Sequence, residues 1–192
     1  MVTALRAFAP APERDDAFLA AWIRCREVLA GTVGVASPTL YRALRSDVAF
    51  RFVELTPVDS PAAWDAATTD PACAGGDAPA ASSGLYEVVR EDGDVDAPGG
   101  ATLIVAFEVT EDADAAFVER WTRAHAVRAP QQGHIGTRLH RSLGPNLLRY
   151  VEVTRWSSPL MHARAARRPE VQDAAGRVAF PSHAALYQVA EV

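Results

Sequence analysis

The stretch LHRSLGPNLLRYVEVTRWSSP, residues 139–159, has a recognisable copy earlier in the same chain. Its central part, RYVEVT at 149–154, matches RFVELT at 51–56, which lies 98 residues before it. Further pairs match in the same order at an offset of 99, namely Ala7-Phe8 with Ala106-Phe107, Ala17-Phe18 with Ala116-Phe117, Trp22 with Trp121, Arg24 with Arg123 and Gly34 with Gly133. Co-linear matches at a nearly constant offset indicate a tandem duplication.

The two copies are predicted to occupy residues 1–90 and 101–192, joined by the acidic, Gly- and Pro-rich linker EDGDVDAPGG at 91–100. In the first copy we expect a degenerate, short second helix followed by a loop. Residues 68–84 contain two prolines and a Gly-Gly pair, which disfavour a helix. All five histidines lie in the second copy, which we therefore expect to be the active half.

Each copy has the hydrophobic pattern of a strand, a helix, two strands, a helix and a strand. In the second copy these elements are predicted at 101–109, 111–128, 133–143, 147–156, from Ser158 to about Arg177, and at 185–192, with a hairpin turn at 144–146. Ser158 is expected as the N-cap of its helix, with Pro159 at the first helical position. The order β-α-β-β-α-β is the ferredoxin-like split motif.

A single unit of this kind leaves one face of its sheet uncovered, and two copies can cover each other's faces. We therefore predict an α+β fold, in which two ferredoxin-like βαββαβ repeats form an intramolecular dimeric α+β barrel. This arrangement suits the modest supply of large core residues, because 38 of the 192 residues are alanine. The chain would be a pseudo-dimer by itself, and the sequence leaves a further homo-oligomer open.

Charge and hydropathy narrow the choice of partners. The 19 basic residues are all arginine, 24 acids outnumber them, and no basic run exceeds the Arg167-Arg168 pair, so we expect no nucleic-acid partner. No stretch approaches the roughly 20 apolar residues that span a bilayer, so we expect no membrane partner. The start, MVTALRAFAPAPERDD, lacks the apolar run of a signal peptide. We therefore predict a soluble cytoplasmic protein.

The two cysteines and the histidines show no metal-binding spacing. Cys25 and Cys73 form no CxxC motif, and in a reducing compartment a disulfide is not expected, so both are predicted to be unpaired packing residues. The histidines form no HxH or HxxxH motif, so we expect no metal site.

Residues 139–159, followed by a helical segment and FPSHAALYQV at 180–189, resemble the antibiotic biosynthesis monooxygenase (ABM) domain family, here in tandem. The usual pattern there is an LHRSL strand, a FVNVAEW strand, Ser-Pro, a helix and an HPALYEV strand. The resemblance implies a dimeric α+β barrel of ferredoxin-like units. It also implies an activity among quinone-forming anthrone oxygenases, ring-cleaving aromatic polyketide oxygenases, heme-degrading enzymes and members with no assigned activity.

In the anthrone oxygenases, catalysis is attributed to a strand asparagine, a tryptophan four residues on and a tyrosine six residues after that. The corresponding positions in the second copy hold Glu152, Trp156 and His162, so the tryptophan alone is retained. The same positions in the first copy hold Glu54, Val58 and Trp64.

The alternation of side chains along a strand provides a second argument for the same site. One face of the predicted strand at 147–156 would carry Leu148, Tyr150, Glu152, Thr154 and Trp156. His162 lies one turn into the next helix, which packs over its own sheet in a ferredoxin-like unit. We therefore expect a cavity with Trp156, His162 and Glu152 as catalytic residues, and with His140, Tyr150 and Leu148 as substrate-binding residues.

These residue types suit proton abstraction from an acidic carbon or phenol. A glutamate whose pKa is raised by an apolar pocket, or a histidine that titrates near neutrality, could be the base. The indole could donate its N–H to a substrate oxygen. The hypothesis is an oxygenase of antibiotic or pigment biosynthesis that converts an anthrone- or angucyclinone-like polyketide to a quinone or a ring-cleaved product. In this hypothesis O2 is the co-substrate and no cofactor is required. Whether the reaction uses reduced flavin is left open.

An alternative is a non-catalytic ligand-binding or scaffold member of the same fold. Glu54 occupies the position of Glu152 in the first copy, which favours a structural pairing with an arginine common to both halves. Heme degradation is a third alternative.

Overall fold

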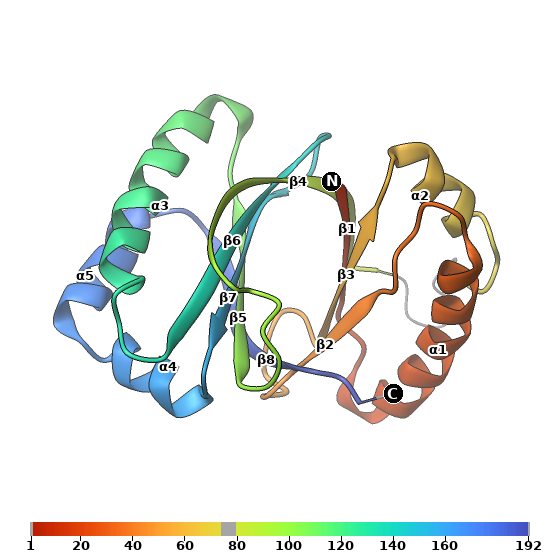
Figure 1. Cartoon of the computed structure of the whole chain (residues 1–192), viewed down its shortest axis with the longest axis horizontal. Coiled ribbons are helices and arrows are strands. Elements are labelled where there is room, and N and C mark those ends of the chain that lie inside the picture. Colours follow the sequence, from red (N-terminus) through yellow and green to blue (C-terminus); the bar gives the residue numbers. More distant parts are fainter. Residues whose placement is uncertain (1, 74–79, 192) are drawn as a thin grey trace. The chain divides into compact units, whose positions relative to one another are not determined.

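The computed structural model describes residues 2–73 and 80–191, which form two compact units (Figure 1). The first unit comprises Met1–Val88, Ser142–Gly144 and Gln188–Val192. The second comprises Val89–Arg141 and Pro145–Tyr187. Within the described ranges, every helix is too short or too polar to cross a membrane.

The described part of the first repeat contains four strands and two α-helices. They are β1 (Val2–Phe8), α1 (Asp15–Gly31), β2 (Thr39–Ala43), β3 (Phe52–Val58), α2 (Pro61–Thr68) and β4 (Ser82–Gly93), with a short 3-10 turn η1 (Pro12–Arg14) before α1. The strands pair antiparallel in the order β4-β1-β3-β2.

The second repeat has the same order of elements with one helix more. They are β5 (Ala101–Glu108), η2 (Glu111–Ala113), α3 (Asp114–Arg128), β6 (His134–Ser142), β7 (Leu148–Trp156), α4 (Pro159–Ala166), α5 (Pro169–Val178) and β8 (Ser182–Val189). Its strands pair antiparallel in the order β8-β5-β7-β6, and α3, α4 and α5 lie along one face of this sheet (Figure 1). Both repeats are therefore ferredoxin-like βαββαβ units, as predicted.

Gly34 and Gly133 show how closely the backbones of the two repeats agree. Both have a positive φ, +82° and +89°, which a residue with a Cβ adopts at a cost. The Gly34 carbonyl accepts a hydrogen bond from Asp59 N, and the Gly133 carbonyl accepts one from Ser157 N, each at 2.8 Å. The sequence match at this pair thus marks the same tight turn before the second strand of each repeat.

Ser158 caps α4 as predicted, since its side chain accepts a hydrogen bond from Met161 N at 3.2 Å. The prediction of one helix from Ser158 to about Arg177 is wrong, because α4 ends at Ala166 and α5 begins at Pro169. A proline disfavours helical geometry in the preceding residue, and Arg168 accordingly has an extended backbone.

In the first repeat, α2 has eight residues, and its N-cap Ser60 accepts a hydrogen bond from Ala63 N. The predicted loop after it includes residues 74–79, which lie outside the described residues.

Each helix that follows a first strand packs an apolar stripe on its own sheet. In α1 the buried residues are Asp15, Phe18, Trp22, Cys25 and Leu29, which recur mostly every three to four positions. In α3 the ring of Phe117 stacks on Tyr150 of β7 with 4.3 Å between centroids. Trp22 of α1 and Trp121 of α3, which match in the repeat, are both buried.

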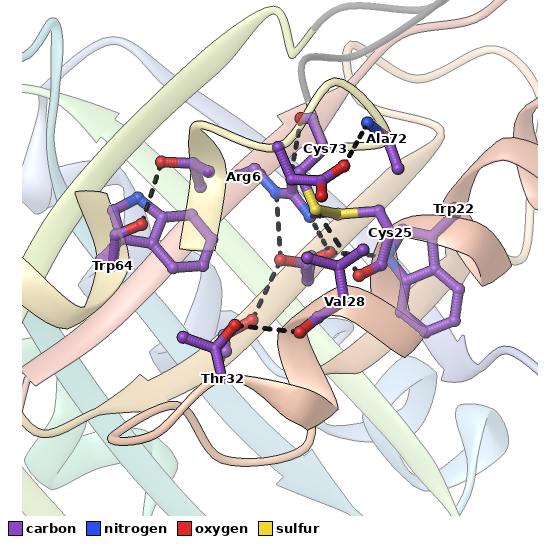
Figure 2. The surroundings of a disulfide bond; sticks show 12 residues. Arg6, Trp22, Cys25, Val28, Thr32, Trp64, Ala72 and Cys73 are labelled. Atoms are coloured by element: carbon purple, nitrogen blue, oxygen red, sulfur yellow. Dashed lines mark hydrogen bonds and ion pairs between the residues drawn. A yellow bond between two sulfur atoms is a disulfide. The ribbon is translucent and has the colours of Figure 1, made fainter. Parts of the chain in front are cut away.

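Cys25 and Cys73 form a disulfide, which corrects the prediction of two unpaired cysteines (Figure 2). The bond ties the buried stripe of α1 to the turn that follows α2, where the two Cα atoms lie 4.7 Å apart. Forty-eight residues separate the cysteines in sequence. Their proximity therefore depends on how α1 and α2 pack on the sheet, which no local spacing reveals.

We predict that this disulfide contributes about 4 kcal/mol to the free energy of unfolding, the chain-entropy value for a closed loop of this length. Urea unfolding would compare the oxidised protein, the same protein in dithiothreitol, and a Cys25→Ala/Cys73→Ala variant. The reduced wild type keeps both sulfur atoms and so separates the bond from the packing. Equal stability of the oxidised and reduced proteins would contradict the prediction.

Candidate active site

Glu152 on β7 lies at the centre of the hydrogen bonds between the second sheet and its first helix. Its side chain is fully buried, and Oε2 accepts hydrogen bonds from Trp121 Nε1 at 2.6 Å and from Arg128 Nη2 at 2.8 Å. Oε1 accepts a third from Thr154 Oγ1 at 2.7 Å. Three donors, one of them cationic, therefore stabilise the ionised carboxylate.

The pKa of Glu152 follows from this environment. Burial raises it, but the charge of Arg128 and the hydrogen bonds from Arg128, Thr154 and Trp121 lower it by more, so the net shift is downward. Glu152 is an anion at neutral pH. The prediction of a glutamate base with a raised pKa, one of the two bases considered above, is therefore wrong.

Glu54 makes the equivalent contacts in the first repeat. It accepts hydrogen bonds from Trp22 Nε1 at 2.6 Å, from Thr56 Oγ1 at 2.9 Å, and from Arg6 Nε and Nη2 at 3.0 and 2.6 Å. A tryptophan, a threonine and an arginine thus surround the buried glutamate of both repeats.

The arginines nevertheless come from different places. Arg6 lies on β1, where the second repeat has Val105, and Arg128 ends α3, where the first repeat has Leu29. The predicted pairing of each glutamate with an arginine is therefore present, but the arginine is not common to the two halves in position. This difference gives the two repeats different surroundings for the same carboxylate.

Trp156 lies at the end of β7, on the same face of the sheet as Glu152. Its ring is edge-on to His162 of α4 at 5.4 Å between centroids and to His134 of β6 at 5.6 Å. The residue is 2% exposed, and its buried Nε1 has no hydrogen-bond acceptor among residues 2–73 and 80–191. An unsatisfied buried donor costs free energy, so this N–H is available to an acceptor on a bound molecule.

His162 is partly buried beside this indole. Burial lowers its pKa below the usual range, and the charge of Arg128 lowers it further. The imidazole is therefore neutral at pH 7 and can accept a proton. The structure thus brings Trp156 and His162 together, and Arg128 acts electrostatically on both His162 and Glu152.

His134 and His125 extend the cluster, and the sequence argument missed them. His134 Nε2 lies 2.8 Å from Thr137 Oγ1, and burial together with the charge of His125 lowers the pKa of His134. His125 stacks on Trp121 with 5.0 Å between centroids. One signal could have found His134. A hairpin centred on Pro145 places residues eleven before and after it opposite each other, and His134 does pair with Trp156.

The three predicted substrate-binding residues divide between the two faces of the sheet. Tyr150 is buried on the Glu152 face, and burial with the nearby Asp114 carboxylate raises its pKa to about 12. Leu148 is also buried. The prediction that His140 lines the same cavity is wrong. It pairs with Val151, so its side chain lies on the opposite face, where burial lowers its pKa to about 4.

In the part of the chain that the structure describes, no group of three or more His, Cys, Asp and Glu side chains is arranged to hold a metal ion.

Among curated proteins, none matches this sequence.

Residues 101–177, which contain the whole cluster, match the model of the antibiotic biosynthesis monooxygenase family. The match extends through the second repeat from β5 into α5.

Solved structures resemble the chain over almost its whole length. An anthrone oxidase-like protein is 18% identical with a TM-score of 0.76, and the match covers 99% of this chain and 91% of that one. A candidate monooxygenase from Fusobacterium nucleatum subsp. nucleatum is 11% identical with a TM-score of 0.66, covering 99% and 92%. A heme-degrading enzyme from Listeria monocytogenes is 13% identical with a TM-score of 0.54, covering 98% and 99%. At these identities the matches show a shared fold.

We predict that Glu152→Gln lowers the free energy of unfolding by about 3 kcal/mol at pH 7, because it leaves Arg128 without its counterion. Glu54→Gln should cost a similar amount, and Glu119→Gln on the exposed side of α3 should change stability by less than about 0.5 kcal/mol. Urea unfolding measures all three.

The effect of Glu152→Gln should also depend on pH. The pKa of this carboxyl is lowered in the folded protein, so its contribution is complete above the unfolded value of about 4.3 and is lost as pH falls through the folded pKa. The stability difference between wild type and variant should therefore shrink below about pH 4. A difference that stays constant down to about pH 3 would show that the carboxylate charge does not stabilise the fold.

Proposed function

We propose, from the match of residues 101–177 to the antibiotic biosynthesis monooxygenase family, that this protein is an oxygenase of polycyclic aromatic polyketides such as anthrones. The observation that carries the proposal is the buried Trp156 N–H, which has no acceptor among the described residues and belongs to an indole that contacts the imidazoles of His134 and His162. A hydrogen-bond donor next to a neutral base is what deprotonation of a hydroxylated aromatic ketone requires.

In the proposed reaction His162 removes a proton from the methylene carbon that lies opposite the ketone of an anthrone. The resulting enolate places negative charge on the ketone oxygen, where the Trp156 N–H donates a hydrogen bond. The electron-rich carbanion then reduces O2 by one electron, and recombination and loss of water complete the oxidation. In sum, one CH2 group and one O2 become one C=O group and one H2O.

Glu152 has a positioning role in this proposal. Its ion pair with Arg128 is partly buried, and Arg128 adds to the effect of burial in lowering the pKa of His162, so that the imidazole stays neutral. Tyr150 and Leu148 would line the substrate cavity on the same face of β7. The substrate supplies the electrons for O2, so the proposal needs no organic cofactor, and a parallel assay with reduced flavin tests the ring-cleaving variant of the reaction.

A second candidate is a non-catalytic member that binds an aromatic ligand. It is favoured by Glu54, which makes the same contacts with a tryptophan, a threonine and an arginine in a repeat without histidine. That part of the cluster is therefore compatible with a purely structural role. The two candidates differ in whether the histidine side of the cluster supports turnover.

We predict quinone formation from an anthrone in air, with one O2 consumed per quinone, measured by an oxygen electrode and chromatography. His162→Ala should lower kcat/KM by about 10²- to 10⁴-fold and Trp156→Phe by about 10²-fold, the usual losses for a general base and a charge-stabilising donor. His183→Ala is the control, because His183 bonds Glu108 outside the cluster. No turnover with or without flavin would leave the non-catalytic candidate. Full rates in both site variants would show that His162 and Trp156 do not carry the reaction.

The pH profile gives an independent check on the base. Because the pKa of His162 is lowered, the neutral base persists as pH falls through the usual value of about 6.5, so kcat/KM should decline only at lower pH. An Arg128→Gln/Glu152→Gln variant removes both members of the ion pair, and with them the positive charge that depresses this pKa. Its acid limb should move to higher pH. An unchanged limb would show that the Arg128 charge does not act on the titrating base.

A further inference from the structure

The first repeat contains a pocket of its own, of about 180 Å³, next to the disulfide. Arg6 and Phe8 of β1, Trp64 and Thr68 of α2 and Ser83 of β4 line it. Figure 2 shows the Trp64 indole beside the Arg6 side chain, with Cys73 on the other side of the guanidinium. All of these residues lie in the first compact unit.

Two aromatic rings, those of Phe8 and Trp64, form part of the pocket wall. The Arg6 guanidinium carbon lies 5.5 Å from the centroid of the Phe8 ring and 5.4 Å from that of Trp64, so the cation holds both rings in place. An apolar cavity of about 150 Å³ accommodates one benzene molecule. The pocket volume therefore suits a single six-membered ring and is too small for a polycyclic polyketide.

The polar groups of the pocket favour a neutral ligand. Arg6 forms two hydrogen bonds to Glu54, at 3.0 and 2.6 Å, so its charge is already balanced. The Trp64 side chain is more than nine-tenths buried, and its indole N–H is a hydrogen-bond donor. Thr68 Oγ1 donates to the Trp64 carbonyl at 2.9 Å, which leaves its oxygen as an acceptor. One donor and one acceptor beside an aromatic wall match the hydroxyl of a phenol.

No histidine lies in the first repeat, and Arg6 is the ionisable side chain among the described residues that line the pocket. The pocket therefore lacks the neutral base that His162 provides in the second repeat. We propose that the first repeat binds a neutral monocyclic phenol without converting it, at a site separate from the proposed oxygenase site.

The experiment uses the full-length oxidised protein labelled with ¹⁵N, in which each indole N–H gives its own resonance and Trp64→Phe assigns that of Trp64. Titration with 4-fluorophenol should shift the Trp64 resonance to saturation. Cyclohexanol, which lacks the aromatic ring, and 4-fluorobenzoate, which is an anion, should bind at least about tenfold more weakly.

Ala80→Leu adds bulk at the pocket wall and should weaken 4-fluorophenol binding by at least about tenfold. Thr68→Leu adds bulk from α2, so the test does not depend on one variant folding. Trp156→Phe is the matched control and should leave the Trp64 shift unchanged. No saturable shift at Trp64, undiminished binding in both filled variants, or tighter binding of 4-fluorobenzoate would overturn the proposal.

These outcomes are independent of the oxygenase activity. Ala80→Leu should keep the wild-type rate of anthrone oxidation, because the substitution lies outside the second unit. A protein that binds 4-fluorophenol but oxidises no anthrone would refute the proposed function alone. Oxidation of anthrone with no shift at Trp64 would refute the phenol site alone.

Discussion

The hydrogen bond between a helix tryptophan and a buried strand glutamate is the interaction on which each repeat depends. Trp22 donates to Glu54 and Trp121 to Glu152, both at 2.6 Å. A buried carboxylate is costly unless several donors compensate it. These hydrogen bonds tie the long helix of each repeat to its sheet, beside the aromatic side chains that pack between the two.

The source of the positive charge distinguishes the two repeats. Arg6 reaches its glutamate from a strand and lies between two aromatic rings, so its surroundings form a small neutral pocket. Arg128 reaches its glutamate from the end of α3, and its charge also lowers the pKa of His162. Both repeats thus place a cation beside the buried carboxylate, but from different positions. The side chains around the two carboxylates differ as a result.

Much of the fold was predictable because it rests on local patterns. The repeat, the order of strands and helices, the Ser158 cap and the burial of Trp22 and Trp121 all follow from spacing along the chain. The position of Pro169 also carried a signal for the break between α4 and α5, which a purely periodic argument overlooked. The candidate site was predictable in part, since strand alternation placed Glu152 and Trp156 on one face.

The sequence by itself determined the duplication, the ferredoxin-like order and the residues of β7 that share a face, because these depend on neighbours along the chain. The tertiary structure decided the rest, namely the disulfide, the opposite facing of His140, the addition of His134 to the cluster and the state of Glu152. Each of these depends on strand register or on helix packing between distant segments. Contacts of that kind set which groups are buried together, and burial together with charge sets their protonation.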